Sequence, residues 1–312
     1  MNPNKPTVLD FFEFIYDRHL IWHKRNVLKQ IQPWTDDPIL GKYKFCNVYR
    51  ELDRCTIHLL NHVINRKTLN LETKIFNILM YRRFNVSYFY DLILPNGAVN
   101  PKQFNVTEIE KKMDLFRKEC RQNLFNDAYI ICQRNYIDNY RKHDKHVQQL
   151  YICKELAERA TEIKKDILNC RNLEDLHTCL KITIPMTGDF IAYQYCTDLT
   201  YLFPGKWAVQ SFVALGPGSK PGIQLLFPNI QKLNGMVQAC KDLASLGTQA
   251  ENFYTLKTKK NKDWIRICYK DAYYGGSFIS LSNIQNCLCE FRKYVNLQKG
   301  IKCRKRYYRG GQ

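Results

Sequence analysis

Long apolar runs are absent from this sequence. No stretch of 18 or more consecutive apolar residues occurs among its 312 residues, so we expect no membrane span. The first residues also lack the basic, apolar and small-residue regions that make up a secretory signal peptide. These absences predict an intracellular protein, which would be nuclear if its host is eukaryotic.

Closely spaced metal-ligand pairs are also scarce, although cysteine is not. The 13 cysteines are odd in number and scattered through apolar or helical contexts, which favours a reducing compartment over a disulfide scaffold. Cys46, Cys55, His58 and His62 lie close together in the sequence, but they lack the Cys-x-x-Cys spacing of structural zinc sites. The sequence therefore predicts no metal and no cofactor.

Strand signals and nucleotide loops are missing as well. No series of alternating Val- and Ile-rich segments occurs, so the predicted class is mainly α. Gly216 to Gly222 (GPGSKPG) is rich in glycine but lacks the Gly-Lys-Ser/Thr ending of a P-loop. We therefore expect phosphoryl transfer from a nucleotide to lie outside these residues.

What the sequence does have is positive charge on an aromatic-rich chain. Its 48 Lys and Arg against 29 Asp and Glu give a net charge of +19, alongside 20 Tyr, 17 Phe and 4 Trp. Such a charge attracts polyanions, while the aromatic content indicates a folded body rather than a disordered tail. Nucleic acid is the predicted class of partner.

Apolar periodicity predicts a succession of amphipathic helices. We expect them at residues 8–31, 45–65, 70–90, 107–141, 145–169 and 282–294. Residues 1–300 are predicted to form one helical domain, with two lobes that could meet near residue 170. Residues 301–312 read as a basic, mobile tail. A short strand and a lysine-rich loop (TLKTKKNKDW) are expected before the last helix.

The helix predicted at 45–65 has a polar face that contains two arginines and no lysine. Arg50 lies on this face with Asn47, and Asp53 is nearby. The planar guanidinium of arginine can bind a phosphate or carboxylate through two hydrogen bonds. An ordinary solvent-exposed face is the alternative for this helix.

Asn172 to Leu202 reads as a helical hairpin. Asn172 can cap a first helix, and Ile184 to Gly188 forms a short turn that ends on a glycine able to adopt positive φ. Backbone N–H groups at the start of the second helix suit a nucleic-acid phosphate. The alternative is a structural αα-hairpin, because Asp189 directly after the turn would repel a phosphate.

Five blocks, in the order PWTDDPIL, FCNVYRELDR, AYQYCTDL, GPGSKPGI and NIQNCLCEFRKY, extend from residue 33 to 294. They resemble the helical domain of 5-hydroxymethyl-deoxyuridine DNA kinases and of α-glutamyl/putrescinyl-thymine pyrophosphorylases, a family of DNA base hypermodification. The resemblance implies a helix-hairpin-helix fold like that of DNA glycosylases. It also implies action on thymines whose 5-hydroxymethyl oxygen is activated and then displaced by an amine.

The resemblance implies roles for particular residues. Catalytic or substrate contacts would come from Asn47, Arg50, Asp53 and Glu290, and nucleic-acid contacts from Thr187, Gly188, Gly216, Gly218, Lys220 and Lys293. Phe190 stands where helix-hairpin-helix glycosylases carry a lysine nucleophile. Asp198 is the carboxylate nearest to the place of their catalytic aspartate. Excision through a Schiff base is therefore not expected.

We accordingly expect a protein that binds double-stranded DNA and acts on a 5-hydroxymethyluracil-type base by substitution at the activated hydroxymethyl group. An amine or amino acid would be its co-substrate, and a separate base kinase would supply the activated base. Two alternatives stay open: a glycosylase that excises a modified base with help from Asp198 or Glu290, and a DNA-binding module without catalysis.

Overall fold

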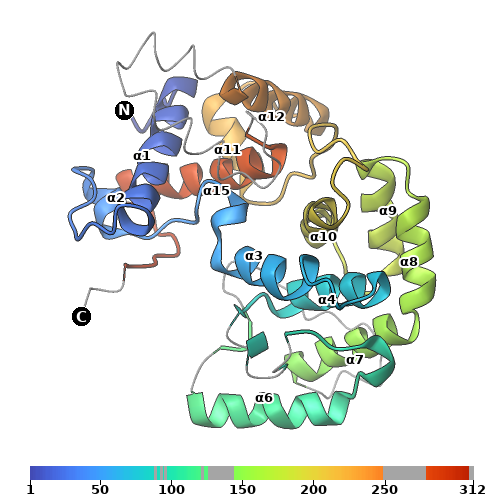
Figure 1. Cartoon of the computed structure of the whole chain (residues 1–312). Helices are drawn as coiled ribbons and strands as arrows, with labels where there is room; N and C mark the ends of the chain where they lie inside the picture. The colour runs from blue at the N-terminus through green and yellow to red at the C-terminus, as the bar shows by residue number, and fades with distance from the viewer. Residues whose placement is uncertain are drawn as a thin grey trace. The chain divides into compact units, whose positions relative to one another are not determined.

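The computed structural model describes residues 1–87, 90–91, 94, 97–120, 123–125, 144–248 and 279–308 (Figure 1). The predicted lysine-rich loop and short strand lie outside these ranges. The chain divides into two compact units: Met1–Asp53 with Val213–Gln312, and Arg54–Phe212. Both divisions of the chain lie far from residue 170, where the sequence suggested that two lobes could meet.

The first unit is built around α15 (Leu281–Gln298), drawn in red in Figure 1. The helices that pack against it are α1 (Val8–Asn26), α2 (Pro38–Lys42), α11 (Ser219–Leu226) and α12 (Leu233–Thr248). Phe11 and Phe14 of α1 contact Phe291 of α15 at ring-centroid distances of 5.3 and 5.5 Å. A cluster of aromatic rings therefore joins α1 to α15 in the core of this unit.

Side-chain caps fix where these helices begin. The Thr7 hydroxyl accepts from the Asp10 N–H, and the Asp10 carboxylate accepts from the Thr7 N–H, which forms a capping box at α1. Asp37 caps α2 directly before Pro38. The Ser280 hydroxyl accepts from the N–H three residues into α15. Each start is thus encoded locally.

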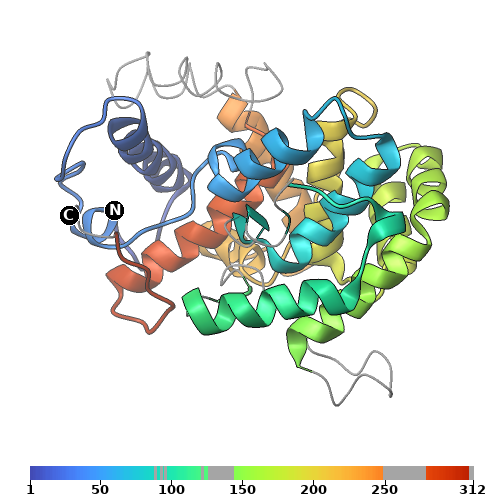
Figure 2. The same ribbon diagram turned by 60° about the horizontal axis from the view of Figure 1, so that its bottom comes forward.

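The second unit is built around α4 (Leu71–Phe84), which is buried on almost all sides because 11 of its 14 residues are inaccessible. The other elements are α3 (Arg54–Leu59), the π-helical turn η2 (Leu60–Ile64), the 3-10 turn η3 (Pro101–Gln103), α6 (Val106–Cys120), α7 (Lys145–Glu158), α8 (Ala160–Asn169), α9 (Leu173–Thr183) and α10 (Asp189–Leu202). α7, α8 and α10 all pack against α4 (Figure 2).

The mainly α class is confirmed within the described residues, whose only β pairing is an isolated bridge between Tyr43 and Tyr307. The predicted hairpin is also present. Asn172 caps α9 by accepting from the Asp175 N–H at 2.8 Å, and Ile184 to Gly188 separates α9 from α10. Among the described residues, every helix is too short or too polar to span a bilayer.

The predicted first helix is too long. It ends at Asn26, and residues 27–31 are exposed, with Lys29 at a positive φ of 53°. With no side chain to bury, these residues gain nothing that would offset the entropy lost in a further helical turn. Within the helix that does form, Arg18 is buried.

The helix predicted at 45–65 is wrong in its first part. Residues 44–49 are not helical, Arg50–Leu52 forms a 3-10 turn (η1), and an α-helix begins only at Arg54. The apolar side chains of Phe45 and Val48 are nevertheless buried. Periodicity therefore identified the buried residues but not the backbone conformation.

Several later helices differ at their ends. α4 stops at Phe84 because Asn85 adopts the left-handed conformation, with φ of 54°. The helix predicted at 145–169 is two helices that meet at Arg159. The last one is longer than 282–294, since α15 runs from Leu281 to Gln298. The predicted extension of α6 to residue 141 is described only as far as Cys120.

The tail predicted to be mobile is packed as far as Tyr308. The Tyr308 ring contacts Trp34 at 5.2 Å, and the Arg25 guanidinium lies 4.8 Å from the Trp34 ring and 5.0 Å from the Tyr308 ring. The Lys44 N–H donates to the Arg306 carbonyl at 2.8 Å. Stacking of a guanidinium between aromatic rings offsets the cost of ordering a basic segment.

Candidate functional site

A row of polar side chains on α15 supports the non-helical segment 44–50 of the first unit. Asn283, Asn286, Glu290 and Lys293 are spaced by three or four residues and so share a helix face. We call them the polar row. Two members accept hydrogen bonds from the segment: Asn283 Oδ1 from the Arg50 N–H at 3.0 Å, and Glu290 Oε2 from the Cys46 N–H at 3.0 Å. The other two donate to backbone carbonyls: Asn286 Nδ2 to that of Asn47 at 3.2 Å, and Lys293 Nζ to that of Lys44 at 3.1 Å.

The polar row explains why the segment need not be helical, because side chains satisfy its buried backbone groups. It also brings together four of the predicted site residues, Asn47, Arg50, Glu290 and Lys293. Their meeting joins positions more than 230 residues apart in the sequence. The contacts made by Glu290 and Lys293 are with backbone atoms and therefore stabilise the segment directly.

Glu290 sets the charge state of its surroundings. The Lys293 ammonium lies 3.9 Å from its carboxylate, and the Lys293 Nζ also lies 4.5 Å from the centre of the Phe45 ring. The negative charge of Glu290, together with burial, raises the pKa of the Cys46 thiol. Cys46 is therefore a neutral thiol and not an activated nucleophile.

Asn47, Arg50 and Asp53 lie on one tight turn rather than on one face of a helix. The Asn47 side chain donates to the Leu52 carbonyl at 2.8 Å, and the Asp53 N–H donates to the Arg50 carbonyl at 3.0 Å. Arg50 is 9% exposed, whereas Asp53 is half-buried. The three residues are therefore close together because of the turn, and not because of the helical spacing that the sequence predicted.

Arg18 of α1 adds a buried cation to this unit. The residue is 5% exposed, and its Nη2 donates to the Asn47 carbonyl at 3.4 Å and to the Cys287 sulfur at 3.0 Å. Its guanidinium carbon lies 5.0 Å from the Phe14 ring centre. Within the described ranges, its Nε and Nη1 atoms have no hydrogen-bond partner. All three of these neighbours are neutral. The Glu290 carboxylate affects the pKa of the same Cys46 and Cys287 thiols as Arg18, but among the described residues the two charged groups form no ion pair.

The glycines of the segment Gly216 to Gly222 allow α11 to approach α15 closely. A Cβ on Gly218 would lie 2.3 Å from the Cys289 sulfur, and one on Gly222 would lie 2.4 Å from the Leu288 carbonyl oxygen. Gly216 is buried and Lys220 is half-buried. Helix packing therefore requires glycine at 218 and 222, whatever else this segment binds.

An arginine inside the second unit holds the hairpin turn. Arg83 is fully buried, and its Nη2 donates to the Pro185 carbonyl at 2.6 Å and to the Thr187 hydroxyl at 2.7 Å. The Thr187 side chain thus faces the interior. Positive φ occurs at Met186 (53°) rather than at Gly188, which has φ of −86° and caps α10. Gly188, which the sequence marked as able to adopt positive φ, therefore does not use that freedom here.

The exposed start of α10 lies at Gly188 and Asp189. Among the described residues, no side-chain hydrogen bond caps this helix. The Lys181 ammonium lies 2.5 Å from the Asp189 carboxylate, which offsets the negative charge that the sequence placed against phosphate binding.

Asp198 forms a buried ion pair. Both of its oxygens face Arg82, whose Nη2 donates to Oδ1 at 2.8 Å and whose Nε donates to Oδ2. Arg82 also donates to Asn85 Oδ1 at 2.5 Å, and the exposed fractions of Arg82 and Asp198 are 1% and 0%. The carboxylate is therefore neutralised by a cation and shielded from solvent.

The sequence did not single out Arg18, Arg82 or Arg83 as buried. A signal for two of them exists in retrospect, because NILMYRRF places Arg82 and Arg83 at the end of a helix that is apolar all round. Arg18 likewise lies within the apolar run FEFIYDRHLIW. Arginine in such contexts is usually paired or hydrogen-bonded in the interior.

Three side chains with metal-ligand chemistry meet in the second unit. His58, His62 and Asp91 each offer one ligand atom, and these atoms lie within 4.8 Å of one another. Cys55, which the sequence grouped with the two histidines, instead donates through its sulfur to the Asn85 carbonyl at 3.3 Å. The group that accompanies the two histidines is thus the Asp91 carboxylate rather than the Cys55 thiol.

Comparison with known proteins gives one family and one relative. The family model described as 5-hmdU DNA kinase, helical domain, matches residues 5–302. A protein named 5-hmdU DNA kinase from Bacillus phage SP10 is 26% identical over 299 residues. The match covers 92% of this chain and 44% of that relative, so the chain spans less than half of its length. No solved structure matches the chain. The chain belongs to the family of 5-hmdU DNA kinase helical domains.

Proposed function

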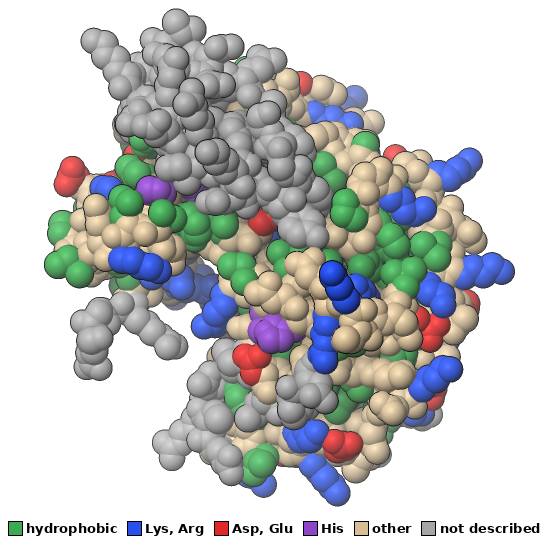
Figure 3. All heavy atoms as spheres, in the orientation of Figure 1, with side chains coloured by type: hydrophobic (Ala, Val, Ile, Leu, Met, Phe, Trp, Pro, Cys, Tyr) green, Lys and Arg blue, Asp and Glu red, His purple; other side chains and the backbone are tan. Residues whose placement is uncertain are grey.

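We propose that this chain binds DNA that contains 5-hydroxymethyluracil and takes part in modifying that base. Membership of the 5-hmdU DNA kinase helical-domain family over residues 5–302 carries this proposal, and the net charge of +19 supports a polyanionic substrate. Lys and Arg side chains are spread over the surface of the second unit, with a few Asp and Glu among them (Figure 3).

The reaction that we propose is substitution at the activated hydroxymethyl carbon. An amine forms a carbon–nitrogen bond to this carbon, the carbon–oxygen bond breaks, and phosphate or pyrophosphate leaves with the bonding electrons while the amine loses a proton. The 312 residues contain no P-loop sequence. Residues outside this sequence would therefore perform the preceding phosphorylation.

Arg18 supports a role in holding the leaving group. A buried guanidinium with neutral neighbours would gain from an anion, and a departing phosphate carries the charge that the site lacks. Asn47 links Arg18 to the turn that carries Arg50. In this proposal the two arginines stabilise negative charge that grows on the leaving oxygen during the reaction.

The helical hairpin is the proposed docking element for DNA. Arg83 fixes the turn from inside, and the exposed residues Gly188 and Asp189 at the start of α10 are the proposed contact for a backbone phosphate. The helix-hairpin-helix architecture of DNA glycosylases is part of this proposal. Such contacts would position the duplex without reading its sequence.

A non-catalytic DNA-binding module is the second candidate. Two observations favour it: Asp198 is neutralised by Arg82, and Glu290 accepts from the Cys46 backbone. Base excision receives less support, because a carboxylate buried at 0% exposure cannot activate water without rearrangement. Phe190, which stands where helix-hairpin-helix glycosylases carry a lysine nucleophile, also argues against base excision.

The test combines binding with product analysis. DNA containing 5-hydroxymethyluracil, the same DNA with that group phosphorylated, and thymine DNA are each incubated with the chain and a set of amines. Mass spectrometry of the released nucleosides then distinguishes the candidates. A base–amine adduct on phosphorylated DNA supports substitution, a free base supports excision, and binding without either supports the module. Equal or absent binding to all three DNAs would refute the whole proposal.

Arg18→Met separates the chemistry from the fold. Because methionine removes a buried charge at similar volume, we expect unchanged or higher thermal stability, together with a loss of turnover on the order of a hundredfold. Arg25→Met is the matched control on the same helix, since Arg25 stacks on Trp34 and Tyr308. Full activity of Arg18→Met would remove Arg18 from the site.

A further inference from the structure

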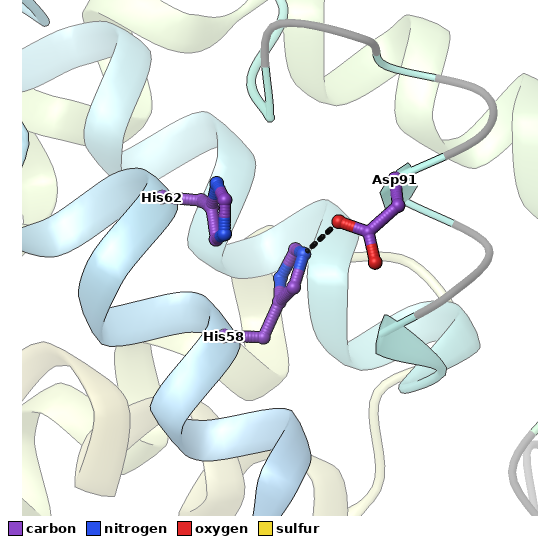
Figure 4. Close-up of side chains that lie close together, drawn as sticks. All are labelled: His58, His62 and Asp91. Atoms are coloured by element: carbon purple, nitrogen blue, oxygen red, sulfur yellow. Dashed lines mark hydrogen bonds and ion pairs between the residues drawn. The ribbon is translucent and has the colours of Figure 1, made fainter.

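We propose that His58, His62 and Asp91 bind one divalent transition-metal ion, with zinc as the chemical type. His58 lies on α3 and His62 on the π-helical turn η2 that continues it. Asp91 approaches from the opposite side, so that the two imidazoles and the carboxylate converge (Figure 4). The inference concerns the second unit alone and does not depend on the proposed function.

The distances are close to those of a metal site. His58 Nε2 lies 2.7 Å from Asp91 Oδ1, the two imidazole centroids are 4.2 Å apart, and all three ligand atoms fall within 4.8 Å of one another. Ligands bound to zinc at about 2.0–2.2 Å in a tetrahedral arrangement are roughly 3.4 Å apart. On metal binding, the distance between His58 Nε2 and Asp91 Oδ1 must therefore increase slightly, and the distances from these atoms to the His62 ligand atom must decrease.

Two of the three ligands are free to make that adjustment. Asp91 has a side-chain exposure of 60%, and His62 is exposed as well. His58 is 8% exposed and acts as the fixed ligand. Its imidazole stacks on Tyr81 of α4 at a centroid distance of 5.6 Å, which anchors the site to the central helix of the unit.

Described residues before and after Asp91 in the sequence make contacts of their own. The Tyr90 hydroxyl donates to the Met80 carbonyl at 2.8 Å, and its ring stacks on Tyr81 at 4.2 Å. Gly97 has a φ of +70°, and a Cβ there would lie 3.0 Å from His62 Cβ and Nδ1. The backbone at Gly97 therefore packs directly on the base of the His62 side chain.

The charge of the cluster fits a divalent cation. The three side chains offer two imidazole nitrogens and one carboxylate oxygen, all within 4.8 Å of one another. Neutral imidazole and carboxylate are both common ligands of divalent metal ions. Imidazole nitrogen favours zinc-like ions over Mg²⁺ and Ca²⁺, which prefer oxygen ligands.

Three protein ligands leave a coordination position open. Structural zinc sites are usually closed by a fourth side chain, whereas sites with an open position hold water or a ligand. Because His62 and Asp91 are exposed, the open position would be reachable from solvent. The geometry therefore fits a site that can take a water molecule or an anionic group such as a phosphate.

Cobalt is the probe for the test, because its visible spectrum reports on the type of ligand. Chain freed of metal by chelation and dialysis is titrated with Co²⁺, and retained zinc is measured separately by mass spectrometry of the metal. We expect about one equivalent of either metal, without the intense near-ultraviolet bands that thiolate ligands produce. Thiolate bands would show that cysteines bind the metal and would overturn the assignment.

Exposed ligands are the ones to replace, because their loss should leave the fold intact. His62→Ala and Asp91→Ala should each weaken Co²⁺ binding by at least about tenfold while the unfolding temperature of the metal-free chain stays the same. His23→Ala, on α1 of the first unit, is the matched control and should bind like the unaltered chain. If His62→Ala binds Co²⁺ like the unaltered chain, or if the unaltered chain binds no Co²⁺, the proposal is wrong. The cluster would then contain only the hydrogen bond between His58 and Asp91.

Discussion

Each unit uses side chains from its central helix to hold a segment that is not helical, but the chemistry differs. In the first unit the polar row of α15 contacts segment 44–50 through two amides, one carboxylate and one ammonium group. In the second unit the fully buried guanidinium of Arg83 holds the turn before α10. The comparison teaches that irregular segments in a helical protein require dedicated interior partners.

The two units also differ in how their buried charges are balanced. Arg82 has a carboxylate partner in Asp198, with both groups almost completely buried. Arg18 in the first unit instead contacts a backbone carbonyl, a sulfur atom and an aromatic ring. We therefore expect the second unit to lose stability when one partner is removed, and the first unit to be indifferent to the loss of its cation.

The largest expected effect comes from breaking the buried ion pair. Asp198→Ala leaves Arg82 charged and unpartnered, which should lower the free energy of unfolding by about 3–5 kcal/mol. The double variant Arg82→Met, Asp198→Leu should recover most of this loss, because no buried charge remains. Denaturant unfolding measures both. A single variant that loses less than about 1 kcal/mol would show that water reaches the pair.

Glycine substitutions contrast close packing in the first unit with the turn in the second. Gly222→Ala places a methyl group 2.4 Å from the Leu288 carbonyl oxygen, so we expect a loss of about 1–3 kcal/mol. Gly188→Ala has no atom within 4 Å of the new Cβ and an ordinary φ. It should change stability by less than about 0.5 kcal/mol. Equal losses in thermal or denaturant unfolding would contradict this contrast.

A buried histidine makes the first unit sensitive to acid. Burial, with smaller contributions from His23 and Arg18, lowers the pKa of His19 from 6.5 to about 3. Between these values the unfolded chain binds a proton that the folded chain does not, so stability falls as pH decreases. From pH 7 to 5 this group should account for a loss of about 2 kcal/mol in the free energy of unfolding.

His19→Phe removes that titration and should reduce the loss between pH 7 and 5 by the same amount. Other buried histidines with lowered pKa, such as His58 and His177, act in the same direction and remain in both proteins. The difference between the two denaturation series therefore isolates His19. Identical slopes would mean that His19 is protonated in the folded chain.

The smallest expected effect tests one bond of the polar row. Asn283→Ala removes the acceptor for the Arg50 N–H, and we expect a loss of about 1–2 kcal/mol in denaturant unfolding. Asn296→Ala, on the half-exposed part of the same helix, is the control. If both variants lose equally, helix propensity rather than the hydrogen bond is responsible.

Much of the helical architecture could be predicted from the sequence. The mainly α class, the Asn172 cap and the division of the hairpin at Ile184 to Gly188 all follow from local signals. The five blocks that carry the family resemblance are likewise readable in the sequence, and the family match confirms them. Local signals suffice here because a cap or a turn involves residues only a few positions apart.

The ends of a helix were harder to predict where they depend on contacts with residues that are distant in the sequence. Segment 44–50 has helical periodicity, yet it is not α-helical, because residues of α15 satisfy its backbone groups. Periodicity marks which side chains are buried, but it does not show whether another element will supply hydrogen bonds. The same limit applies to residues 301–308, whose aromatic partner Trp34 lies far away in the sequence.

The sequence by itself determined the charge, the helical class and the residues that resemble a DNA base modification family. Only the tertiary structure decided which of those residues meet: Asn47 with Arg18, Asp198 with Arg82, and Asp91 with the two histidines. The physical reason is that such sites join side chains from elements distant in the sequence. Their burial and pairing depend on packing that no short window of sequence contains.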